Sequence, residues 1–456
     1  MMTISRKGRA AFAVVLLLCC TLLLLHLVAF SPTTLSPATS VPKWSALASK
    51  PAALPSDSSG IECTSPLTLK SSCHATNVCF YQNKLHVFSD SPDVKARFHG
   101  QTFLLPPMHN QALRKDRLQQ FGPYQYSQRI NVRVTTRAEE SGMPTKRKWI
   151  NEQVALIAFT GLGHYGHWLM DAAAPVFRLM KNWGRLDYNT RIWTRGAQPG
   201  PPISMPDAWR SVVKHPLSIL EEEVALAEHK GSMLCMRDML WGLQIGAFSR
   251  KYDQFHFEFR DWAIEHLDIN VPRPKRPKMI IDSRQCPKRC LHNEAELITE
   301  LRARFGDIMD VEPVRFEGMT LRQQISKVQE ATILLGASGT GTHNAIFLRN
   351  NSVVVDIMST WVHTKQLKSE YYANSHICGA NSPQTILCLA IWTEPNTTLA
   401  REVVTNDPSL SVARDLPLVV DIPALMLEIE GAILPHGLNE ELINEIMSAE
   451  VFDDKS

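Results

Sequence analysis

The sequence predicts an α/β fold whose carboxyl-terminal half contains an open parallel sheet. Short apolar runs at residues 279–282, 331–336 and 352–357 have the length and composition of buried strands. Helix-start signals lie between these runs, and a glycine-rich turn follows the second one. This alternation is typical of a doubly wound unit.

The helices of this unit are predicted from their first residues. Asn293 and Glu296 have the spacing of a capping box, and Thr320 and Gln323 repeat it for a second helix through residue 328. A further helix is expected at residues 422–433, where it could pack back across the domains. These elements complete the expected order of strands and helices.

Two basic side chains and a glycine turn are predicted to form a phosphate cradle. Ligands of such sheets bind beyond the carboxyl ends of the strands, so the loop with Arg284 and Arg289 should face the turn with Gly339 and Gly341. Glycines allow close backbone approach to an anion at the start of a helix expected near His343. The alternatives are a tight turn without a ligand and ordinary solvated arginines.

Two better known phosphate motifs do not fit the glycine turn. The turn has the glycine spacing of a P-loop, but Thr342 and His343 replace the required Lys and Ser/Thr, which argues against a kinase-like ATPase. Asn344 replaces the third glycine of a dinucleotide fingerprint, which argues against hydride chemistry.

The first residues predict a membrane anchor. Residues 10–30 form an apolar run long enough to cross a bilayer, and basic residues in the segment 1–9 should keep that tail in the cytosol. A cleaved signal peptide is the alternative. Residues 31–60, rich in Ser, Pro, Ala and Thr, are expected to form a flexible stem, followed by domains at 61–275 and 276–456.

The charge balance argues against a nucleic-acid partner. The formal net charge is +3, and Arg6, Lys7 and Arg9 in the predicted cytosolic tail account for it. The remainder of the chain is therefore close to neutral, which gives no general attraction to a polyanion.

Cysteines and sequons agree with a lumenal location. Eight of the ten cysteines follow the predicted anchor, and an even number suggests disulfides. Cys286 and Cys290 flank the cradle loop and are expected to pin it; zinc is the alternative. Asn350 and Asn396 begin acceptor sequences for N-glycosylation. The eight cysteines are Cys63, Cys73, Cys79, Cys235, Cys286, Cys290, Cys378 and Cys388.

A second constellation follows an apolar strand expected at residues 154–160. A helix from His167 onward, with a kink at Pro175, would place His167 and Asp171 on one face, where the carboxylate could orient the imidazole as a general base. A packed core helix with a satisfied histidine is one alternative. A metal site formed by His164, His167 and Asp171, as in a metal-dependent hydrolase, is another.

These constellations together resemble glycosyltransferase family 61 over about residues 159–357. The amino-terminal block is similar in His167-Trp-Leu-x-Asp171-x3-Pro175. The carboxyl-terminal signature is similar in Ile281-Asp-Ser-Arg284-x4-Arg289-x3-Asn293-Glu294, Glu317, Gly336-x2-Gly339-x-Gly341-x2-Asn344 and Phe347. The joint pattern is more specific than any of its pieces.

The resemblance implies a GT-B architecture, with two Rossmann-like domains facing a cleft. It also implies inverting transfer of xylose, arabinose or N-acetylglucosamine from a nucleotide diphosphate sugar, in particular a UDP-sugar, to a glycan or glycoprotein. No cofactor and no metal are expected. The expected location is the Golgi or endoplasmic reticulum membrane, as a single-pass type II protein with a lumenal catalytic domain.

By the same resemblance, His167 would be the catalytic base and Asp171 its orienting partner. Donor-binding roles fall on Arg284, Arg289, Glu317, Ser338, Gly339, Thr340, Gly341, His343 and Asn344. The chain departs from the family pattern at Ser338, where His is usual, at Thr340, where Ala is common, and at His343, where Thr or Ser is frequent. These departures motivate an alternative, a catalytically inactive lumenal glycan-binding or scaffolding protein with the same fold.

Overall fold

The computed structural model describes residues 59–68, 71–105, 129–158, 165–195, 206–215, 217–242, 255–286, 289–359, 386–393 and 417–433. The predicted anchor at 10–30 and nearly all of the predicted stem lie outside these ranges. No helix within them is both long and apolar enough to span a bilayer. All described residues belong to one compact unit that covers 49–456.

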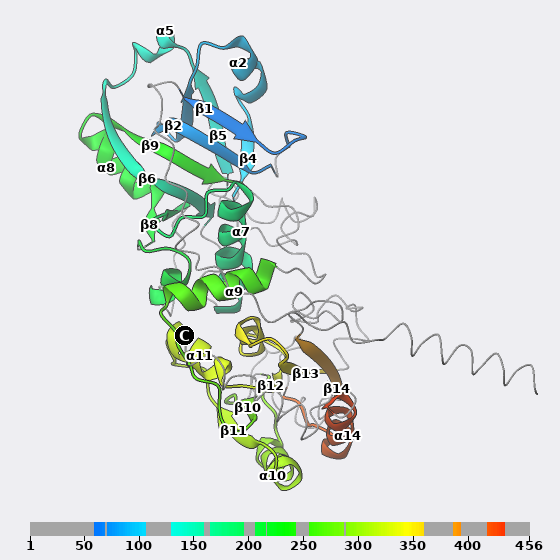
Figure 1. Cartoon of the computed structure of the whole chain (residues 1–456). Coiled ribbons are helices and arrows are strands. Elements are labelled where there is room, and N and C mark those ends of the chain that lie inside the picture. The colour runs from blue at the N-terminus through cyan, green and yellow to red at the C-terminus, as the bar shows by residue number, and fades with distance from the viewer. Residues whose placement is uncertain are drawn as a thin grey trace, which may run out of the picture. The chain divides into compact units, whose positions relative to one another are not determined.

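The first part of the described chain forms a mixed sheet with flanking helices (Figure 1). Its elements are β1 (Gly60–Cys63), β2 (Cys73–Tyr81), β3 (Lys84–Phe88), α2 (Pro92–Phe98), β4 (Thr102–Leu104), β5 (Arg129–Thr135), α5 (Arg137–Glu140), β6 (Lys146–Ala158), α6 (Tyr165–His167), the π-helix η3 (Trp168–Ala173), α7 (Ala174–Asn182), β7 (Arg191–Arg195), the 3-10 helix η4 (Pro206–Ser211), β8 (Ser218–Ile219), α8 (Leu220–His229), β9 (Ser232–Trp241) and α9 (Phe255–His266).

This sheet is only partly Rossmann-like. Its order is β4-β5-β3-β2-β9-β6-β7-β8, with β1 beside β2. The run β9-β6-β7-β8 is parallel, whereas β2 pairs antiparallel with β3, β9 and β1. Gln82 and Asn83 both have positive φ, 48° and 61°, the requirement of a two-residue hairpin turn, and this turn makes β2 and β3 antiparallel. The run β9-β6-β7-β8 thus has the parallel pairing expected of a Rossmann-like sheet, the strands around β2 do not, and the predicted Rossmann-like domain stays a prediction.

Disulfides hold the antiparallel strands together. Cys63–Cys73 joins β1 to β2, and Cys79–Cys235 joins β2 to β9. The predicted disulfides are confirmed at these positions, and Cys388 is also disulfide-bonded. Cys378 lies outside the described residues.

The carboxyl-terminal part contains the predicted parallel sheet. Its elements are β10 (Lys278–Asp282), α10 (Glu294–Phe305), β11 (Asp310–Val314), α11 (Leu321–Gln329), β12 (Ile333–Ala337), the 3-10 helix η5 (Thr342–Phe347), β13 (Val353–Ser359), β14 (Leu387–Thr393) and α14 (Ile422–Ile433). Every neighbouring pair in the order β11-β10-β12-β13-β14 is parallel (Figure 1). The predicted strands and the helix at 422–433 are confirmed.

The strand order locates a topological switch point. Numbered along the chain, the five strands run 2-1-3-4-5, so the order reverses between β10 and β12. In open α/β sheets of this order, ligands bind beyond the carboxyl ends of the two strands at the reversal. The chain places its basic loop after β10 and its glycine turn after β12.

One of the two predicted capping boxes forms. The Thr320 side chain accepts a hydrogen bond from the Gln323 N–H, and the Gln323 side chain accepts one from the Thr320 N–H. Asn293 precedes α10 but makes no capping hydrogen bond. Its side-chain amide instead bonds both the N–H and the carbonyl of Val420, each at 2.9 Å, so the predicted box with Glu296 is wrong. A tertiary partner outcompetes the local cap.

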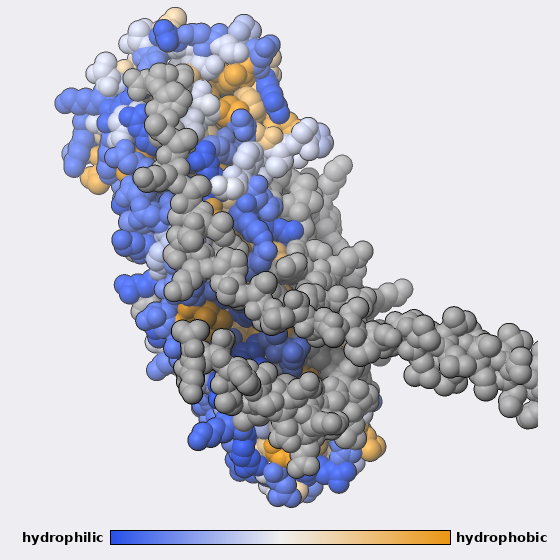
Figure 2. Space-filling model, in the orientation of Figure 1, coloured by the Kyte–Doolittle hydropathy of each residue, from blue (hydrophilic) through white to orange (hydrophobic). Residues whose placement is uncertain are grey.

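The sheet rests on an apolar core whose members lie on β10, β12, β13, α10 and α14, among them Ile281, Leu335 and Leu425. On the face shown in Figure 2, the coloured surface is mostly hydrophilic and its hydrophobic areas are smaller. Among the described residues, the exposed large hydrophobic side chains are Leu226, Ile308 and Leu427. The strands β10 and β12 at the switch point are thus both part of this core.

Candidate active site

A disulfide closes the loop after β10. Cys286 and Cys290 form a disulfide across it, so both sulfurs are engaged and the zinc alternative is removed. Arg289 lies inside the closed loop with a φ of 48°, a left-handed conformation that is costly for a side chain larger than glycine. The disulfide thus confines the backbone from which the Arg289 guanidinium extends.

Arg284 and Arg289 converge on Gly339. A Cβ atom at Gly339 would lie 2.8 Å from Arg284 Nη1, 3.2 Å from Arg284 Nη2 and 2.9 Å from Arg289 Nη1. Any side chain at this position would displace the two guanidinium groups from the places that they occupy. The structure therefore brings together the three residues that the sequence placed on two separate loops.

The convergence of two cations has an electrostatic cost. Both Nη1 atoms lie within 3 Å of the same point, so they are no more than about 6 Å apart. Two unit charges at that distance repel by about 3 kcal/mol at an effective dielectric constant of ~20. An anion bound beside both groups would offset this repulsion, which is the electrostatic property expected of a diphosphate site.

Asp282 orients the first of these arginines, and sequence reasoning assigned it only to a strand. Its side chain is 3% exposed, and its Oδ2 accepts a hydrogen bond from Arg284 Nε at 3.0 Å. This contact leaves the Nη side of the guanidinium directed at Gly339. Burial raises the pKa of the Asp282 carboxyl, and the charge of Arg284 opposes that rise.

Two glycines make room for the Asp282 carboxylate. A Cβ atom at Gly341 would lie 2.0 Å from Asp282 Oδ2, and one at Gly336 would lie 2.8 Å from Asp282 Cβ. The absence of side chains at these two glycines thus leaves room for the carboxylate that positions Arg284. An acidic residue at the end of β10, two residues before an arginine, was the sequence signal for this arrangement.

The backbone N–H groups of Ser338 and Gly339 have partners within the protein. The Gly339 N–H donates to Thr342 Oγ1 at 3.1 Å, and the Ser338 N–H donates to the Ile357 carbonyl at 2.8 Å. The predicted helix after the turn is the short 3-10 helix η5. Positive charge at this site is therefore supplied by guanidinium groups, because the Gly339 amide already has a partner within the turn.

Asn344 links the turn to the amino-terminal half of the chain. Its Nδ2 donates to Gln324 Oε1 at 2.9 Å, and its Oδ1 accepts from the Tyr165 hydroxyl at 2.5 Å. Burial raises the pKa of the Tyr165 hydroxyl, which keeps it protonated as a donor. The Asn344 amide thus has a structural use that the sequence did not reveal.

The His167 block meets the glycine turn. A Cβ atom at Gly166 would lie 3.3 Å from His343 Cδ2 and 3.6 Å from Thr340 Oγ1. Gly166 immediately precedes His167, so the two predicted constellations come together at the end of α6. The side chains of His167 and Asp171 lie outside the described residues, and their predicted roles stay predictions.

The helix that carries this block is wider than predicted. The backbone is α-helical over Tyr165–His167, π-helical over Trp168–Ala173 and α-helical again from Ala174. Pro175 lacks an N–H and its ring would clash with the carbonyl four residues earlier in an α-helix; the π-helical turn widens the helix before that ring. The predicted kink at Pro175 is therefore realised as a π-helical segment that contains Asp171.

Glu317 lies on the rim of the site. It is exposed and pairs with Arg315 at 3.0 Å, and Arg315 also donates to Gln285 of the cradle loop at 2.7 Å. Its negative charge contributes to the raised pKa of Asp282. The structure thus places Glu317 near the cradle, with Arg315 as its ion-pair partner.

Metal ligands do not gather in the described ranges, where no three His, Cys, Asp or Glu side chains lie close enough together to hold an ion. His164 and the side chains of His167 and Asp171 lie outside the described residues, so the predicted alternative metal site is not tested. The acidic residue at the cradle, Asp282, is paired with an arginine.

Comparison with known families decides the assignment. Residues 165–355 match the family model Glycosyltransferase 61. This part of the chain belongs to glycosyltransferase family 61. The match begins at Tyr165 and ends within β13, so it includes both the His167 block and the cradle of this glycosyltransferase domain. No curated protein matches the chain significantly.

Proposed function

We propose that this glycosyltransferase transfers a sugar from a nucleotide diphosphate sugar to a glycan or glycoprotein hydroxyl with inversion at the anomeric carbon. The observation that supports this proposal is the convergence of Arg284 and Arg289 on Gly339, at the switch point of the parallel sheet. Two guanidinium groups can bind a diphosphate through paired hydrogen bonds.

In the proposed mechanism, the acceptor hydroxyl attacks the anomeric carbon from the face opposite the leaving group. The new bond joins the acceptor oxygen to that carbon, and the bond from the carbon to the diphosphate oxygen breaks. His167 takes the hydroxyl proton, and Asp171 orients the imidazole and stabilises its charge. The electron pair leaves with the nucleoside diphosphate, whose charge is stabilised by Arg284 and Arg289, with no metal required.

The wider architecture of the proposal follows the family resemblance. We propose a GT-B arrangement with domains at 61–275 and 276–456, the second binding the nucleotide, with xylose, arabinose or N-acetylglucosamine carried by UDP. Family members typically act in the secretory pathway, and we propose a Golgi or endoplasmic reticulum location with the segment 10–30 as anchor. Ser338, Thr340, His343 and Glu317 would surround the donor.

Steady-state kinetics on a panel of UDP- and GDP-sugars tests the cradle. Arg284→Ala should lower kcat/KM by about 100-fold or more, because one charged contact to the leaving group is worth several kcal/mol. Arg322→Ala is the matched control, since Arg322 is exposed and its guanidinium donates to the Asp268 backbone carbonyl. A kcat/KM for Arg284→Ala within threefold of wild type would refute the cradle.

A second pair of measurements tests the base and the scaffolding alternative. His167→Ala should lower kcat, whereas a changed acceptor KM at constant kcat would make His167 a binding residue. Thermal stabilisation by a nucleotide sugar should accompany activity. If no donor stabilises the wild-type protein and none is hydrolysed, the protein is the inactive scaffolding protein and not an enzyme.

A further inference from the structure

A second feature of the molecule lies at the opposite end of the parallel sheet from the cradle. Residues 349–352 form the turn between η5 and β13, and they contain the sequon Asn350-Asn351-Ser352. The cradle follows the carboxyl ends of β10 and β12, whereas this turn precedes the amino end of β13. A five-residue strand separates the two ends by roughly 16 Å.

The turn presents Asn350 to solvent in a fixed orientation. Asn350 and Asn351 are exposed, and Asn351 has a φ of 63°, which bends the chain away from the strand. Ser352 is buried, and its hydroxyl donates to the Ala331 carbonyl at 3.3 Å. The backbone of the sequon is therefore anchored while its acceptor residue points outward.

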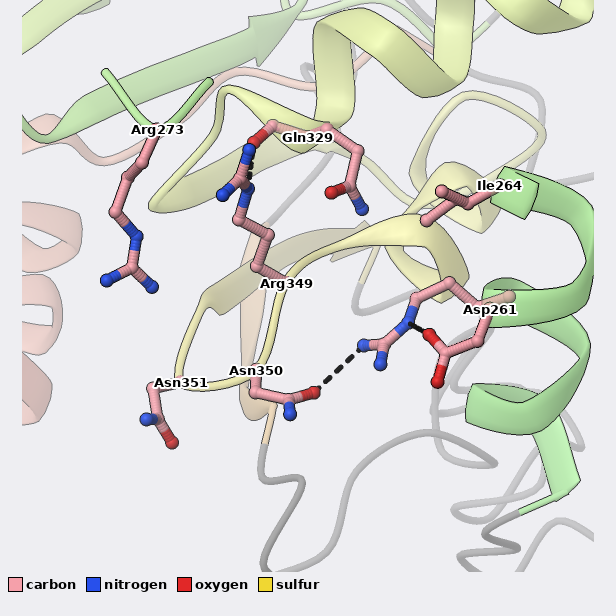
Figure 3. A pocket seen from close by; sticks show the side chains of 8 residues that line it. Asp261, Ile264, Arg273, Gln329, Arg349, Asn350 and Asn351 are labelled. Atoms are coloured by element: carbon pink, nitrogen blue, oxygen red, sulfur yellow. Dashed lines mark hydrogen bonds and ion pairs between the residues drawn. The ribbon is translucent and has the colours of Figure 1, made fainter. Parts of the chain in front are cut away.

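Arg260 of α9 holds one end of the Asn350 amide. Its Nη1 donates to Asn350 Oδ1 at 3.0 Å and to the Leu348 carbonyl at 2.8 Å, and Figure 3 draws the contact to Asn350 as a dashed line. N-glycosylation attaches a sugar to Nδ2 and leaves Oδ1 as an acceptor. The hydrogen bond from Arg260 is thus compatible with a glycan on Asn350.

A cavity of about 290 Å³ lies next to this amide. Figure 3 shows Arg349, Asn350 and Asn351 on its turn side and Asp261 and Ile264 on the helix side. Two arginines on its wall have partners in the protein: Arg260 pairs with Asp261 at 2.8 Å, and Arg349 donates to the Gln329 carbonyl at 2.7 Å. The cavity leaves uncrowded space beside the Asn350 amide.

We infer that Asn350 carries an N-linked glycan. The co-reactant is a lipid pyrophosphate-linked oligosaccharide of the secretory pathway. The Asn350 Nδ2 forms a bond to the anomeric carbon of that oligosaccharide, the bond from this carbon to the pyrophosphate oxygen breaks, and Nδ2 loses one proton as the lipid pyrophosphate leaves. The inference rests on the proposed lumenal location but not on the transferase activity.

The test is expression of the full chain in secretory eukaryotic cells, followed by release of glycans with a peptide N-glycosidase in heavy-oxygen water. The enzyme converts a glycosylated Asn to Asp with one heavy oxygen, which mass spectrometry assigns to its position. Wild type should be labelled at position 350. Ser352→Thr and Asn351→Gly keep the sequon, and the latter suits the positive φ, so both should be labelled as well.

Asn350→Gln should remove this label and should leave kcat/KM unchanged, because the turn lies at the far end of the sheet from the cradle. An unlabelled Asn350 in the wild-type protein purified from these cells would overturn the inference. The proposed function fails separately: an active enzyme with an unmodified Asn350 refutes only the glycan, and a glycosylated protein without transferase activity refutes only the proposed function.

Discussion

Gly341→Ala should destabilise the protein through a single side chain. Gly341 has φ −69° and ψ −42°, an ordinary right-handed conformation, so alanine causes no backbone strain there. The added Cβ would lie 2.0 Å from Asp282 Oδ2, 2.4 Å from its Cγ and 2.5 Å from its Oδ1. Asp282 is buried, and the carboxylate must move more than 1 Å to reach an ordinary contact distance.

The magnitude follows from what that movement breaks. The Asp282 carboxylate would leave its 3.0 Å hydrogen bond with Arg284 Nε, and separating a buried ion pair costs about 3–5 kcal/mol. Partial relaxation of the loop reduces this cost, so we expect a loss of about 2–4 kcal/mol in the free energy of unfolding. Donor affinity should fall at the same time, because Asp282 orients Arg284 toward Gly339.

Urea unfolding of four proteins measures the effect: wild type, Gly341→Ala, Asp282→Ala and the double variant. The collision is absent when Asp282 is already alanine, so Gly341→Ala should cost less than about 0.5 kcal/mol in that background. Gly431→Ala is the matched control, because Gly431 lies in α14 with open space around it, and alanine there should stabilise by about 0.5–1 kcal/mol. An equal cost of Gly341→Ala in both backgrounds would refute the reasoning.

Three further measurements test other parts of the structure. Burial lowers the pKa of His86 to about 4, so the unfolded chain binds a proton at this histidine before the folded protein does as the pH falls from 6.5 toward 4. Urea unfolding should therefore show that the free energy of unfolding of the wild type falls by about 3 kcal/mol over that window. The same fall in His86→Gln would contradict this reasoning. Replacing Cys286 and Cys290 together by Ser should raise the donor KM several-fold, because Arg289 loses the restraint on its left-handed backbone. An unchanged KM would show that the disulfide does not contribute to donor binding. Tyr165→Phe leaves the buried Asn344 Oδ1 without its Tyr165 donor and should lower the free energy of unfolding by about 1–3 kcal/mol. The control Tyr188→Phe removes a hydroxyl that donates to an exposed carbonyl and should lower it by less than half as much. Equal losses would argue against a structural role for Asn344.

Local signals were sufficient for much of the carboxyl-terminal sheet. The strands β10, β12 and β13 are apolar runs buried on both faces, and the helix α11 begins at a capping box that Thr320 and Gln323 complete within the same turn. The edge strands were not predicted from the apolar pattern of the sequence, and β11 shows the physical reason. β11 contains Asp310, Glu312 and Pro313, which only an edge strand tolerates, and β11 pairs with β10 alone.

The sequence by itself determined which residues could form the cradle, because two arginines after one buried strand, and the glycines at the end of another strand and in the turn after it, are local features. Only the tertiary structure decided how they are used. It placed Asp282 between Gly336 and Gly341 and directed the Gly339 N–H to the Thr342 hydroxyl. It also joined Tyr165 to Asn344 by a hydrogen bond across 179 positions of the chain. Such choices depend on packing between distant segments, where a buried polar group must find its partner within the fold and no periodicity of the chain records which partner that is.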